Sequence, residues 1–597
     1  MIHFASLIQT QAKKYGEKPA FRCKDPESGR WNPTSWNQFN ELVSKVALAF
    51  GSAGIKVQEN VAICSQNMAE CIIAEFGLFQ NRAVSVPIYA TSSSSQIEYI
   101  VNDASVRFLL VGEQQQYDNA WKASSNCPTL AQIIIFDQKV KKHQLDKSSV
   151  YLTDFLQTTE TADAPQLVNE RIASATIEDT AAILYTSGTT GEPKGAVLLH
   201  SNFQEAMRIH PGRLPDITDK DLSMSFLPMT HVFEKTWVFF CLTMGTEIAI
   251  NHDPKAIQTT IKEVRPTIMC SVPRFWEKVY EAVQEKINSS GTVTKKIFLD
   301  AIETGRKHNI EYINEGKKPP MALSIKYKLY DKTIYALLKK TIGIEKGNFF
   351  PTAGAALSDN INIFLHAVGI HILYGYGLTE STATVCCFWK TGYKIGTVGT
   401  IMPGVEVKIG ENNEILLKGE TIIKGYYNKP EENAKSFVDG WFKTGDAGTL
   451  VGNRIIMKER IKDLFKTSNG KYVAPQAIET KIGEDKYIDQ IAIIGNNRKY
   501  VTALIVPAYP ALQKYAQENK IDCSDMNKLV NNEQIIELYR NRINALQVNF
   551  ANYEQIKKFT LLPQPFSMEN GELTNTLKMK RLAIEGRYAA DIKKMYE

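Results

Sequence analysis

The chain has 597 residues, of which 44% are hydrophobic and 22% charged, as expected of a folded globular protein. Its formal net charge of +6 is small for this length and argues against a nucleic-acid partner. The nine cysteines form no CxxC pair and no Cys/His metal spacing, and neither a signal peptide nor a transmembrane stretch is visible. Reduced thiols in a cytoplasmic protein are therefore expected, and secreted, disulfide-stapled and membrane-spanning classes are excluded.

Short apolar runs alternate with helical patterns in the first half of the chain. Strands are expected at 61–64, 84–88, 108–111 and 133–136, and helices at 36–50 and 69–79. Strand, helix and strand at this spacing predict parallel α/β sheets.

The segment 277–349 is helical in pattern and rich in Lys and Tyr. Within 317–346, eight lysines stand against Asp331 and Glu345, a net charge of +6. Six apolar residues are expected on one helical face, namely Ile325, Leu329, Ile334, Leu337, Leu338 and Ile342. The pattern favours a surface helix with a solvated basic side, and contact with an anionic membrane surface is the alternative.

After residue 405 the alternation of strand and helix patterns gives way to a series of short strand patterns. A hairpin is expected at 406–418 around Asn412 and Asn413, and short strands continue to 457. Beyond residue 460, strands at 491–494 and 501–506 indicate a separate α+β unit. We therefore predict an N-terminal domain over 1–459, containing the basic helical insertion at about 277–349, and a C-terminal domain over 460–597.

The most informative stretch is a loop of sequence YTSGTTGEPKG, residues 185–195, between apolar strands at 181–184 and 196–199. Its glycines allow close backbone approach, and successive N–H groups and hydroxyls can form an anion cradle. Lys194 adds a positive charge, although the spacing is not that of the GxxxxGK[ST] loop. The loop resembles the signature of the adenylate-forming superfamily, which includes acyl-CoA synthetases. The resemblance implies phosphate contacts from Thr186, Ser187, Gly188, Thr189, Thr190, Gly191 and Lys194.

Two further motifs resemble the nucleotide site of the same superfamily. Gly354-Ala355-Ala356 matches the turn that flanks adenine, where small residues admit a flat ring. The octapeptide YGYGLTES, residues 374–381, implies Tyr376 and Gly377 at adenine and Thr379 at the α-phosphate. By the same resemblance Glu380 and Thr186 hold Mg²⁺, which prefers carboxylate and phosphate oxygens.

The remaining motifs concern the ribose and the second domain. WFKTGD, residues 441–446, implies that Asp446 accepts from the ribose hydroxyls, and Arg460 matches the second ribose contact. In the segment 459–475, Lys462 sits at the hinge position and Gly470 in the loop that lines the CoA thiol tunnel. The stretch 569–581 resembles the motif of the catalytic lysine, which aligns to Lys578, with Lys580 as the alternative.

Two stretches resemble long-chain fatty acyl-CoA synthetases in particular, SVPRFWEK at 271–278 and LPMTHVFEK at 227–235. The second implies that His231 gates the meeting point of CoA and acyl-adenylate. Some members of this subgroup carry a gating Trp where this chain has Lys235, with Trp237 two residues further. The position of the acyl gate and the chain length of the acid therefore stay open.

The resemblance covers essentially the whole chain. It implies an α/β fold, in which parallel α/β sheets and a small β-barrel-like subdomain are hinged to a small α+β C-terminal domain. It also implies ATP- and Mg²⁺-dependent conversion of a long-chain fatty acid to acyl-AMP and then, with CoA, to acyl-CoA. The catalytic group would be Lys578, Glu380, Thr379 and His231. Transfer to acyl carrier protein, another carboxylic acid, or a scaffold without catalysis are the alternatives. Peripheral contact with the inner face of a membrane is expected if the basic segment binds lipid, and the sequence leaves the oligomeric state open.

Overall fold

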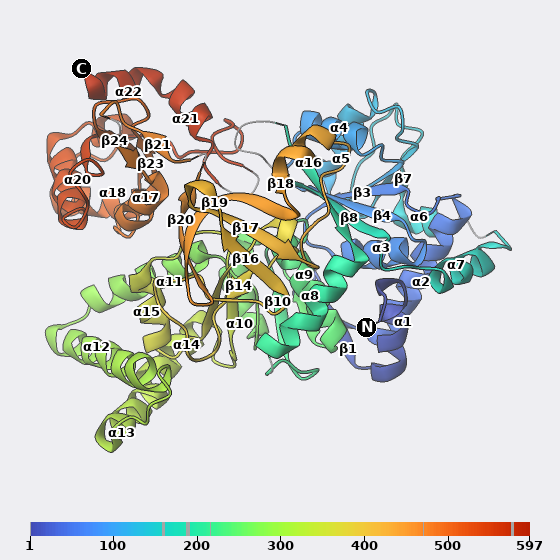
Figure 1. Cartoon of the computed structure of the whole chain (residues 1–597), viewed down its shortest axis with the longest axis horizontal. Helices are drawn as coiled ribbons and strands as arrows, with labels where there is room; N and C mark the ends of the chain where they lie inside the picture. Colours follow the sequence, from blue (N-terminus) through green and yellow to red (C-terminus); the bar gives the residue numbers. More distant parts are fainter. Residues whose placement is uncertain are drawn as a thin grey trace.

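The computed structural model describes residues 2–157, 161–186, 192–214, 216–461, 463–469, 471–574 and 578–597. Figure 1 shows a large N-terminal domain and a smaller C-terminal domain, drawn in red and dark orange. The fold is mixed α/β, as predicted. Within the described ranges, none of the helices combines the length and apolar character that crossing a bilayer requires.

The first sheet has seven strands in the order β7-β6-β5-β3-β4-β8-β9. All neighbours run parallel except β8 and β9, which pair antiparallel. The four predicted strands are confirmed as β3 to β6 and form the centre of this sheet. The bounds are β3 (Asn60–Ser65), β4 (Val84–Tyr89), β5 (Phe108–Val111), β6 (Gln132–Ile135), β7 (Val150–Tyr151), β8 (Thr180–Thr186) and β9 (Lys194–Leu199).

Helices cover both faces of this sheet. The predicted helices are confirmed as α2 and α3, and α2 begins with a capping box between Ser35 and Gln38. The two helices pack closely, since a Cβ on Gly77 would lie 2.6 Å from Val46. The bounds are α1 (Phe4–Tyr15), α2 (Trp36–Ser52), α3 (Ala69–Gln80), α4 (Ser94–Asp103), α5 (Gln114–Ser124), α6 (Leu152–Gln157) and α7 (Ala164–Ala173).

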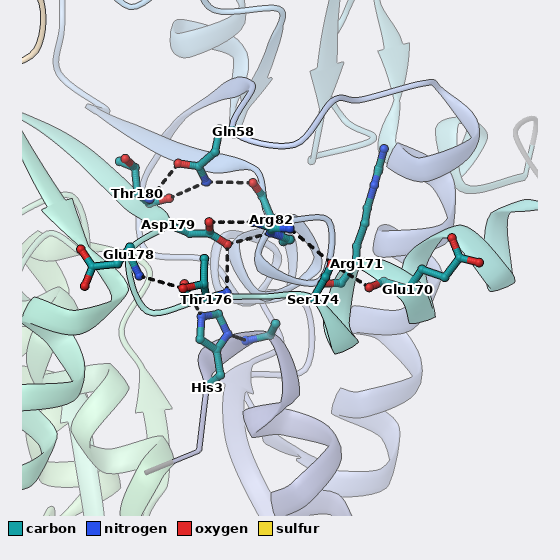
Figure 2. Close-up of polar contacts among 11 residues, drawn as sticks. His3, Gln58, Arg82, Glu170, Arg171, Ser174, Thr176, Glu178, Asp179 and Thr180 are labelled. Atoms are coloured by element: carbon teal, nitrogen blue, oxygen red, sulfur yellow. Dashed lines mark hydrogen bonds and ion pairs between the residues drawn. The ribbon is translucent and has the colours of Figure 1, made fainter.

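A polar network fixes the start of β8, the strand that leads into the phosphate loop (Figure 2). Arg82 donates two hydrogen bonds to Asp179, of 2.8 and 2.9 Å. Gln58 accepts from the backbone N–H of Thr180 at 2.8 Å and donates to the Arg82 carbonyl at 3.0 Å. A bidentate guanidinium–carboxylate pair sets orientation as well as distance, so β8 enters the sheet in a fixed direction.

The second sheet has the order β10-β11-β1-β2. Helix α9 connects β10 to β11, and α10 follows β11 in the chain. The bounds are β1 (Pro19–Lys24), β2 (Trp31–Ser35), β10 (Leu222–Ser225), β11 (Glu247–Ile250), α8 (His200–Arg213), α9 (Val232–Met244) and α10 (Ile257–Val264).

A nine-stranded sheet carries the predicted β-rich subdomain. The expected hairpin is confirmed as β16 and β17, with positive φ angles of 55° and 60° at Asn412 and Asn413. Asn tolerates this left-handed region, which explains the turn. The bounds are β12 (Phe350–Thr352), β13 (Ile372–Tyr376), β14 (Cys386–Cys387), β15 (Thr400–Ile401), β16 (Val405–Ile409), β17 (Glu414–Gly419), β18 (Phe437–Val438), β19 (Trp441–Val451), β20 (Arg454–Arg460), α15 (Asp359–Ala367) and α16 (Pro430–Ser436).

The insertion is helical, as predicted, but its six apolar residues do not share one face. Ile334, Leu338 and Ile342 pack against the core, whereas Ile325, Leu329 and Leu337 are 60%, 61% and 63% exposed. The reason is that π-helical turns interrupt the regular helix, so a 3.6-residue period does not continue through it. The bounds are α11 (Pro273–Asn288), α12 (Thr292–Gly305), η2 (Arg306–Ile313), α13 (Met321–Tyr330), η3 (Asp331–Tyr335) and α14 (Ala336–Ile342).

The C-terminal domain surrounds a three-stranded sheet, β23-β24-β25, with apolar cores of its own. The strands predicted at 491–494 and 501–506 are confirmed as β23 and β24. The bounds are β21 (Phe465–Lys466), β22 (Tyr472–Val473), β23 (Ile488–Ile494), β24 (Val501–Pro507), β25 (Ile556–Leu561), α17 (Pro475–Ile482), α18 (Tyr509–Glu518), α19 (Met526–Val530), α20 (Glu533–Leu546), α21 (Arg581–Arg587) and α22 (Ala589–Tyr596).

Candidate active site

A cavity of about 2750 Å³ lies between the two domains and reaches into the N-terminal domain. Strand ends and loops from both domains line it, so residues far apart in sequence face one space. Every described residue with a predicted catalytic or nucleotide-binding role lines this cavity. These residues are Thr186, Lys194, His231, Gly354, Ala355, Ala356, Tyr376, Gly377, Thr379, Glu380, Asp446, Arg460 and Lys578. The other predicted positions lie outside the described residues, namely Ser187, Gly188, Thr189, Thr190, Gly191, Lys462 and Gly470.

The two ends of the loop between β8 and β9 lie side by side in the first sheet. Thr186 ends β8 and Lys194 begins β9, and the two are paired in the antiparallel ladder. The Lys194 ammonium forms an ion pair with Glu432 of α16 and lies 5.6 Å from the centre of the Tyr426 ring. Glu432 belongs to none of the sequence motifs, so its position beside Lys194 could not be predicted and becomes visible only in the folded structure.

A tyrosine, a carboxylate and a guanidinium form a short chain of polar contacts at the cavity wall. The Tyr376 hydroxyl donates to Asp446 Oδ2 at 2.6 Å, and Arg460 Nε lies 3.2 Å from Asp446 Oδ1. Asp446 and Arg460 are direct partners in the β19–β20 ladder, which explains their spacing along the chain. Burial raises the pKa of Tyr376, and the neighbouring Asp446 charge raises it further. Tyr376 is therefore a neutral donor.

Glu380 lies in a 3₁₀ turn directly after β13 and points to a second tyrosine. Its Oε1 accepts from the Tyr426 hydroxyl at 2.7 Å, and its carbonyl accepts from Ile423 N–H at 2.9 Å. Tyr426 also bridges to Ala196 of β9, so it joins the acidic turn to the strand after the phosphate loop. Tyr426 lies 46 residues from Glu380 and outside every recognised motif, so this contact could not be predicted from the sequence.

Glu380 and Thr186 both line the cavity, where they can supply a carboxylate and a hydroxyl oxygen to a divalent cation. Hard cations such as Mg²⁺ take such ligands and complete their shell with phosphate oxygens and water. Among the described residues no group of three or more His, Cys, Asp or Glu side chains could hold a metal ion. A carboxylate and a hydroxyl suit a cation whose remaining ligands are phosphate oxygens and water.

Two glycines let the backbone approach a flat ligand. Gly354 has a φ of +96°, which favours glycine, and the next carbonyl, of Ala355, accepts from the Tyr374 hydroxyl at 3.2 Å. A Cβ on Gly377 would lie 1.3 Å from the Ala383 carbonyl oxygen, so only glycine fits there. The predicted adenine position is therefore bordered by backbone and small side chains, at the Gly354 turn and at Gly377.

Lys578 reaches the cavity from the C-terminal domain, whereas Lys580 is absent from the described lining. The side chain is exposed to the cavity but surrounded by protein. This burial, with the charge of Arg460, lowers the pKa of Lys578, while Asp446, Asp463 and Glu380 oppose the shift. The geometry therefore favours the alignment of the catalytic lysine to Lys578. No described residue of the hairpin β21–β22 lines the cavity, so the domain presents Lys578 rather than this hairpin.

His231 precedes α9 and faces the same cavity. Its Nδ1 accepts from Phe233 N–H at 3.2 Å, which caps the first turn of the helix. Burial, and to a smaller extent the charge of Lys578, lowers the pKa of His231 to about 4. The imidazole is therefore neutral at physiological pH.

Lys235 and Trp237 of α9 differ in whether they face the cavity. Lys235 faces the core, where its Nζ forms a buried ion pair with Glu75 at 2.6 Å. Trp237 lines the cavity together with Phe233 and Phe240, and its Nε1 donates to Ser223 at 2.9 Å. Trp237 is therefore the aromatic wall of an apolar arm of the cavity, and Lys235 has a structural role.

The stretch at 271–278 supports the same arm from the other side. Trp276 is fully buried and donates to Ser271 Oγ at 2.9 Å and Thr352 Oγ1 at 3.0 Å. These contacts tie the start of α11 to β12, the strand before Gly354. Val272 and Phe275, beside them, line the cavity.

The chain is similar to known proteins over nearly its whole length. Residues 8–427 match the family described as AMP-binding enzyme, and residues 462–597 match the AMP-binding enzyme C-terminal domain. The chain is 28% identical to long-chain-fatty-acid–CoA ligase FadD15 of Mycobacterium tuberculosis, covering 95% of this chain and 93% of that protein. It is 27% identical to long chain acyl-CoA synthetase 4 of Arabidopsis thaliana, covering 99% and 91%.

Solved structures show the same fold. The adenylation domain of a carboxylate reductase from Mycobacterium chelonae has a TM-score of 0.76 at 20% identity, covering 100% of this chain and 91% of that one. A fatty acyl CoA synthetase of Mycobacterium tuberculosis has a TM-score of 0.61 at 20% identity, covering 99% of each chain. Because the family match extends over most of the chain, the chain belongs to the AMP-binding enzyme family.

Proposed function

We propose that this protein is an AMP-forming long-chain fatty acid–CoA ligase. One observation carries the proposal: a single cavity joins the polar group around Asp446 and Lys578 to an apolar arm lined by Phe233, Trp237 and Phe240. A carboxylate at the junction would lie between the nucleotide and an environment suited to a hydrocarbon chain. The relatives named as long-chain ligases support the same substrate class.

In the first half-reaction, a carboxylate oxygen attacks the α-phosphorus of ATP, and pyrophosphate leaves. Lys578 contributes positive charge where negative charge develops, and Thr379 contributes a hydroxyl to the α-phosphate region. Asp446 and Arg460 orient the ribose, while Tyr376 and the Gly354 turn enclose adenine. Magnesium bound at Glu380 and Thr186 would neutralise phosphate charge. The loop from Thr186 to Lys194 would hold the β- and γ-phosphates.

In the second half-reaction, the CoA thiolate attacks the acyl carbon of acyl-AMP, the bond to AMP breaks, and AMP leaves. We propose that the chain divides into domains 1–459 and 460–597 and that the C-terminal domain rotates about Lys462 between the two steps. The rotation would withdraw Lys578 and bring Gly470 to the thiol route. A neutral His231 can then line the meeting point of thiol and adenylate without a competing positive charge.

Preference for long acids follows from the apolar arm. Each buried CH₂ contributes roughly 0.8 kcal/mol, so affinity should rise with acid length until the arm is filled. The decisive experiment is ATP–pyrophosphate exchange with a panel of acids from acetate to oleate, together with one aryl acid. A higher kcat/KM for acetate or the aryl acid than for palmitate would reject the long-chain assignment.

The acceptor is tested separately. Acyl-AMP formed by the enzyme should be consumed by CoA with release of acyl-CoA. Faster consumption by acyl carrier protein would favour the alternative, an acyl–acyl carrier protein synthetase. No exchange with any carboxylic acid would favour a scaffold that keeps the fold without catalysis.

We propose a cytoplasmic protein with reduced thiols, since all nine cysteines are free in the structure. We also propose that the basic insertion brings the protein to the inner, anionic face of a membrane. The lysines in 317–346 support this proposal, since each basic residue near such a surface contributes about 1 kcal/mol.

A further inference from the structure

Glu459 lies beside Arg460 and joins the last strand of the nine-stranded sheet to the C-terminal domain. It is the penultimate residue of β20, and it is 2% exposed. Its Oε2 accepts from the backbone N–H of Gln476 at 2.9 Å. Gln476 belongs to α17, which packs beside β20 where the two domains meet (Figure 1). Because Glu459 and Arg460 are neighbours in one strand, the positions of α17 and of the Arg460 guanidinium depend on the same piece of backbone.

Glu459 supplies the cap that α17 lacks. The helix begins at Pro475, which has no N–H, and the preceding residue, Ala474, has no side chain that could accept a hydrogen bond. The first N–H groups of a helix have no partner within it, and acidic groups near this end are stabilising. The carboxyl of Glu459 therefore fixes the start of α17 from the neighbouring sheet. Lys462, the proposed hinge, lies between the two partners in the sequence.

The second half of α17 is tied to the segment that carries Lys578. Glu479 is buried, and its two oxygens accept from the Arg581 guanidinium, each at 2.6 Å. Glu479 also accepts from the Ile493 backbone N–H at 2.8 Å. A bidentate pair of this kind sets orientation as well as distance. Arg581 begins α21 three residues after Lys578, so one ion pair transmits the placement of α17 to the lysine segment.

The second oxygen of Glu459 is buried without a partner. Within the part of the chain that the structure describes, no group donates to its Oε1. The charged groups around the carboxyl are Glu479 of α17, Arg581 of α21 and Asp463, which follows β20. Burial and then the charge of Glu479 raise the pKa of Glu459 to about 7, with a smaller contribution from Asp463. The Gln476 N–H and Arg581 oppose the shift. When Oε1 carries a proton, Oε2 remains an acceptor for α17.

We propose that Glu459 is a positioning residue for the first half-reaction, which keeps Lys578 in line with the ribose contact Arg460. This inference rests on the proposed function. Glu459 holds the start of α17, and the pair of Glu479 with Arg581 passes this placement on to the lysine. The backbone that orients the sugar then also sets the distance of the lysine charge from the reacting phosphate. Rotation of the C-terminal domain breaks the bond to α17, so Glu459 has no part in thioester formation.

The first experiment separates the two half-reactions in three variants. Glu459→Ala removes the acceptor, whereas Glu459→Gln keeps an oxygen for the Gln476 N–H but cannot ionise. Glu406→Ala is the matched control, since Glu406 is exposed in β16 and is absent from the described cavity lining. Adenylation is measured as single-turnover formation of acyl-AMP from ATP and palmitate. The second step is measured as thioester formation from synthetic acyl-AMP and CoA.

We expect Glu459→Ala to slow adenylation by at least about tenfold, because a hydrogen bond to a charged group is worth about this factor. Its thioester formation should be at least as fast as in the wild type. Glu459→Gln should adenylate at least as fast as the wild type, and the control should be unaffected in both steps. An equal loss of both steps in Glu459→Ala overturns the positioning role, as does a loss in Glu459→Gln as large as in Glu459→Ala.

The same assays separate this inference from the proposed function. If wild-type enzyme forms no acyl-AMP from any carboxylic acid, the proposed function fails, and the positioning role fails with it. Normal adenylation in both the wild type and Glu459→Ala rejects the positioning role alone.

The second experiment uses pH to ask whether Glu459 is enclosed during adenylation. Between its ordinary pKa of 4.5 and about 7, the carboxyl binds a proton in this orientation and releases it when rotation exposes it to water. Protonation therefore favours this orientation fully below pH 4.5, and the effect is lost as the pH rises through about 7. Because Gln stays neutral, the adenylation rate of the wild type relative to Glu459→Gln should fall at least about threefold from about pH 6 to about pH 8.5. A constant ratio would show that Glu459 is not enclosed in this step and would overturn the positioning role.

Discussion

Tyr376 and Asp446 are 70 residues apart in sequence, yet the tyrosine hydroxyl donates to the carboxylate at 2.6 Å. Tyr376 ends β13, and Asp446 lies in β19 of the same sheet. In the proposed site the ring stacks on adenine and the carboxylate holds the ribose. The hydrogen bond therefore couples the positions of base and sugar before any nucleotide arrives.

Removing this hydroxyl should weaken nucleotide binding without disturbing the fold. A hydrogen bond to a charged group contributes about 1.5–3 kcal/mol, so Tyr376→Phe should raise the KM for ATP by about tenfold or more. The ring remains, so kcat should change less than KM. Steady-state kinetics of pyrophosphate exchange provide the measurement. Tyr427→Phe, a neighbour of Tyr426 outside the described lining, is the control. Equal KM values for the two variants would contradict the coupling.

Substitutions of the two lysines of the C-terminal motif, Lys578 and Lys580, should have clearly different effects on adenylation. Lys578→Ala should reduce adenylation by ~10²–10³, since a charge aimed at developing negative charge is lost from a water-poor site. The same variant, given synthetic acyl-AMP and CoA, should form thioester at nearly the wild-type rate. Lys580→Ala is the matched control. A defect in Lys580→Ala alone would show that the alignment is displaced by two residues.

The pKa of His231 should depend on whether the charge of Lys578 lies nearby. The pKa of His231 is lowered from 6.5 to about 4, first by burial and then by the charge of Lys578. Between these two pH values the unfolded chain binds a proton that the folded chain does not. The contribution of this group to stability is therefore complete above pH 6.5 and is lost as the pH falls toward 4.

Lys578→Ala should raise the pKa of His231 above its wild-type value while leaving it below the ordinary range. The measurement is an NMR titration of the His231 ring protons, assigned by their loss in His231→Gln. An identical titration in wild type and Lys578→Ala would contradict the proximity of the two groups.

The buried ion pair of Lys235 and Glu75 should dominate the local stability of α9. Both side chains are nearly inaccessible, at 4% and 7%. Removing one partner leaves a buried charge without compensation, so Lys235→Met should cost about 3–5 kcal/mol. The double variant Lys235→Met/Glu75→Gln should recover most of this loss. The midpoint of urea unfolding of the N-terminal domain measures it. A double variant as unstable as Lys235→Met would contradict the pairing.

Contacts of Asp489 hold the C-terminal domain in the orientation that presents Lys578. Asp489 of β23 forms an ion pair with Arg274 and lies 3.7 Å from Lys278, both in α11. The pairs are partly exposed, so each contributes at most about 1 kcal/mol, and Asp489→Asn should slow adenylation only a few-fold. Thioester formation from synthetic acyl-AMP should not slow.

Lys462→Pro should have the opposite effect to Asp489→Asn, so that thioester formation is impaired and adenylation is spared. A proline fixes φ near −65° and would prevent the hinge from turning, so thioester formation should be lost and adenylation largely kept. Single-turnover assays of each half-reaction measure both variants. Equal losses in both steps, for either variant, would indicate a folding defect and not an altered orientation.

Much of this architecture could be predicted from the sequence. The central strands β3 to β6, the hairpin around Asn412 and Asn413, and the helix after Ser35 depend on local signals. Apolar runs, turn residues and a capping box act over a few residues, so they can be recognised without the fold. The site motifs were identified by resemblance, since each is a short pattern of unusual residues.

Other features could not be predicted from local signals. The partners of known residues, such as Tyr426 for Glu380 and Glu432 for Lys194, come from segments without a motif. Ile325, Leu329 and Leu337 were expected on the same helical face as Ile334, Leu338 and Ile342, but π-helical turns changed the register and left the first three in solvent.

The sequence by itself therefore determined the family and the order of many elements, and it predicted residues that the structure gathers in one cavity. The tertiary structure decided that Trp237 and not Lys235 faces the cavity, that Lys578 and not Lys580 reaches it, and that the apolar arm extends to α14. The physical reason is that motifs and capping signals are local. Which side of a helix meets a cavity depends instead on contacts between residues far apart in the chain, such as Lys235 with Glu75.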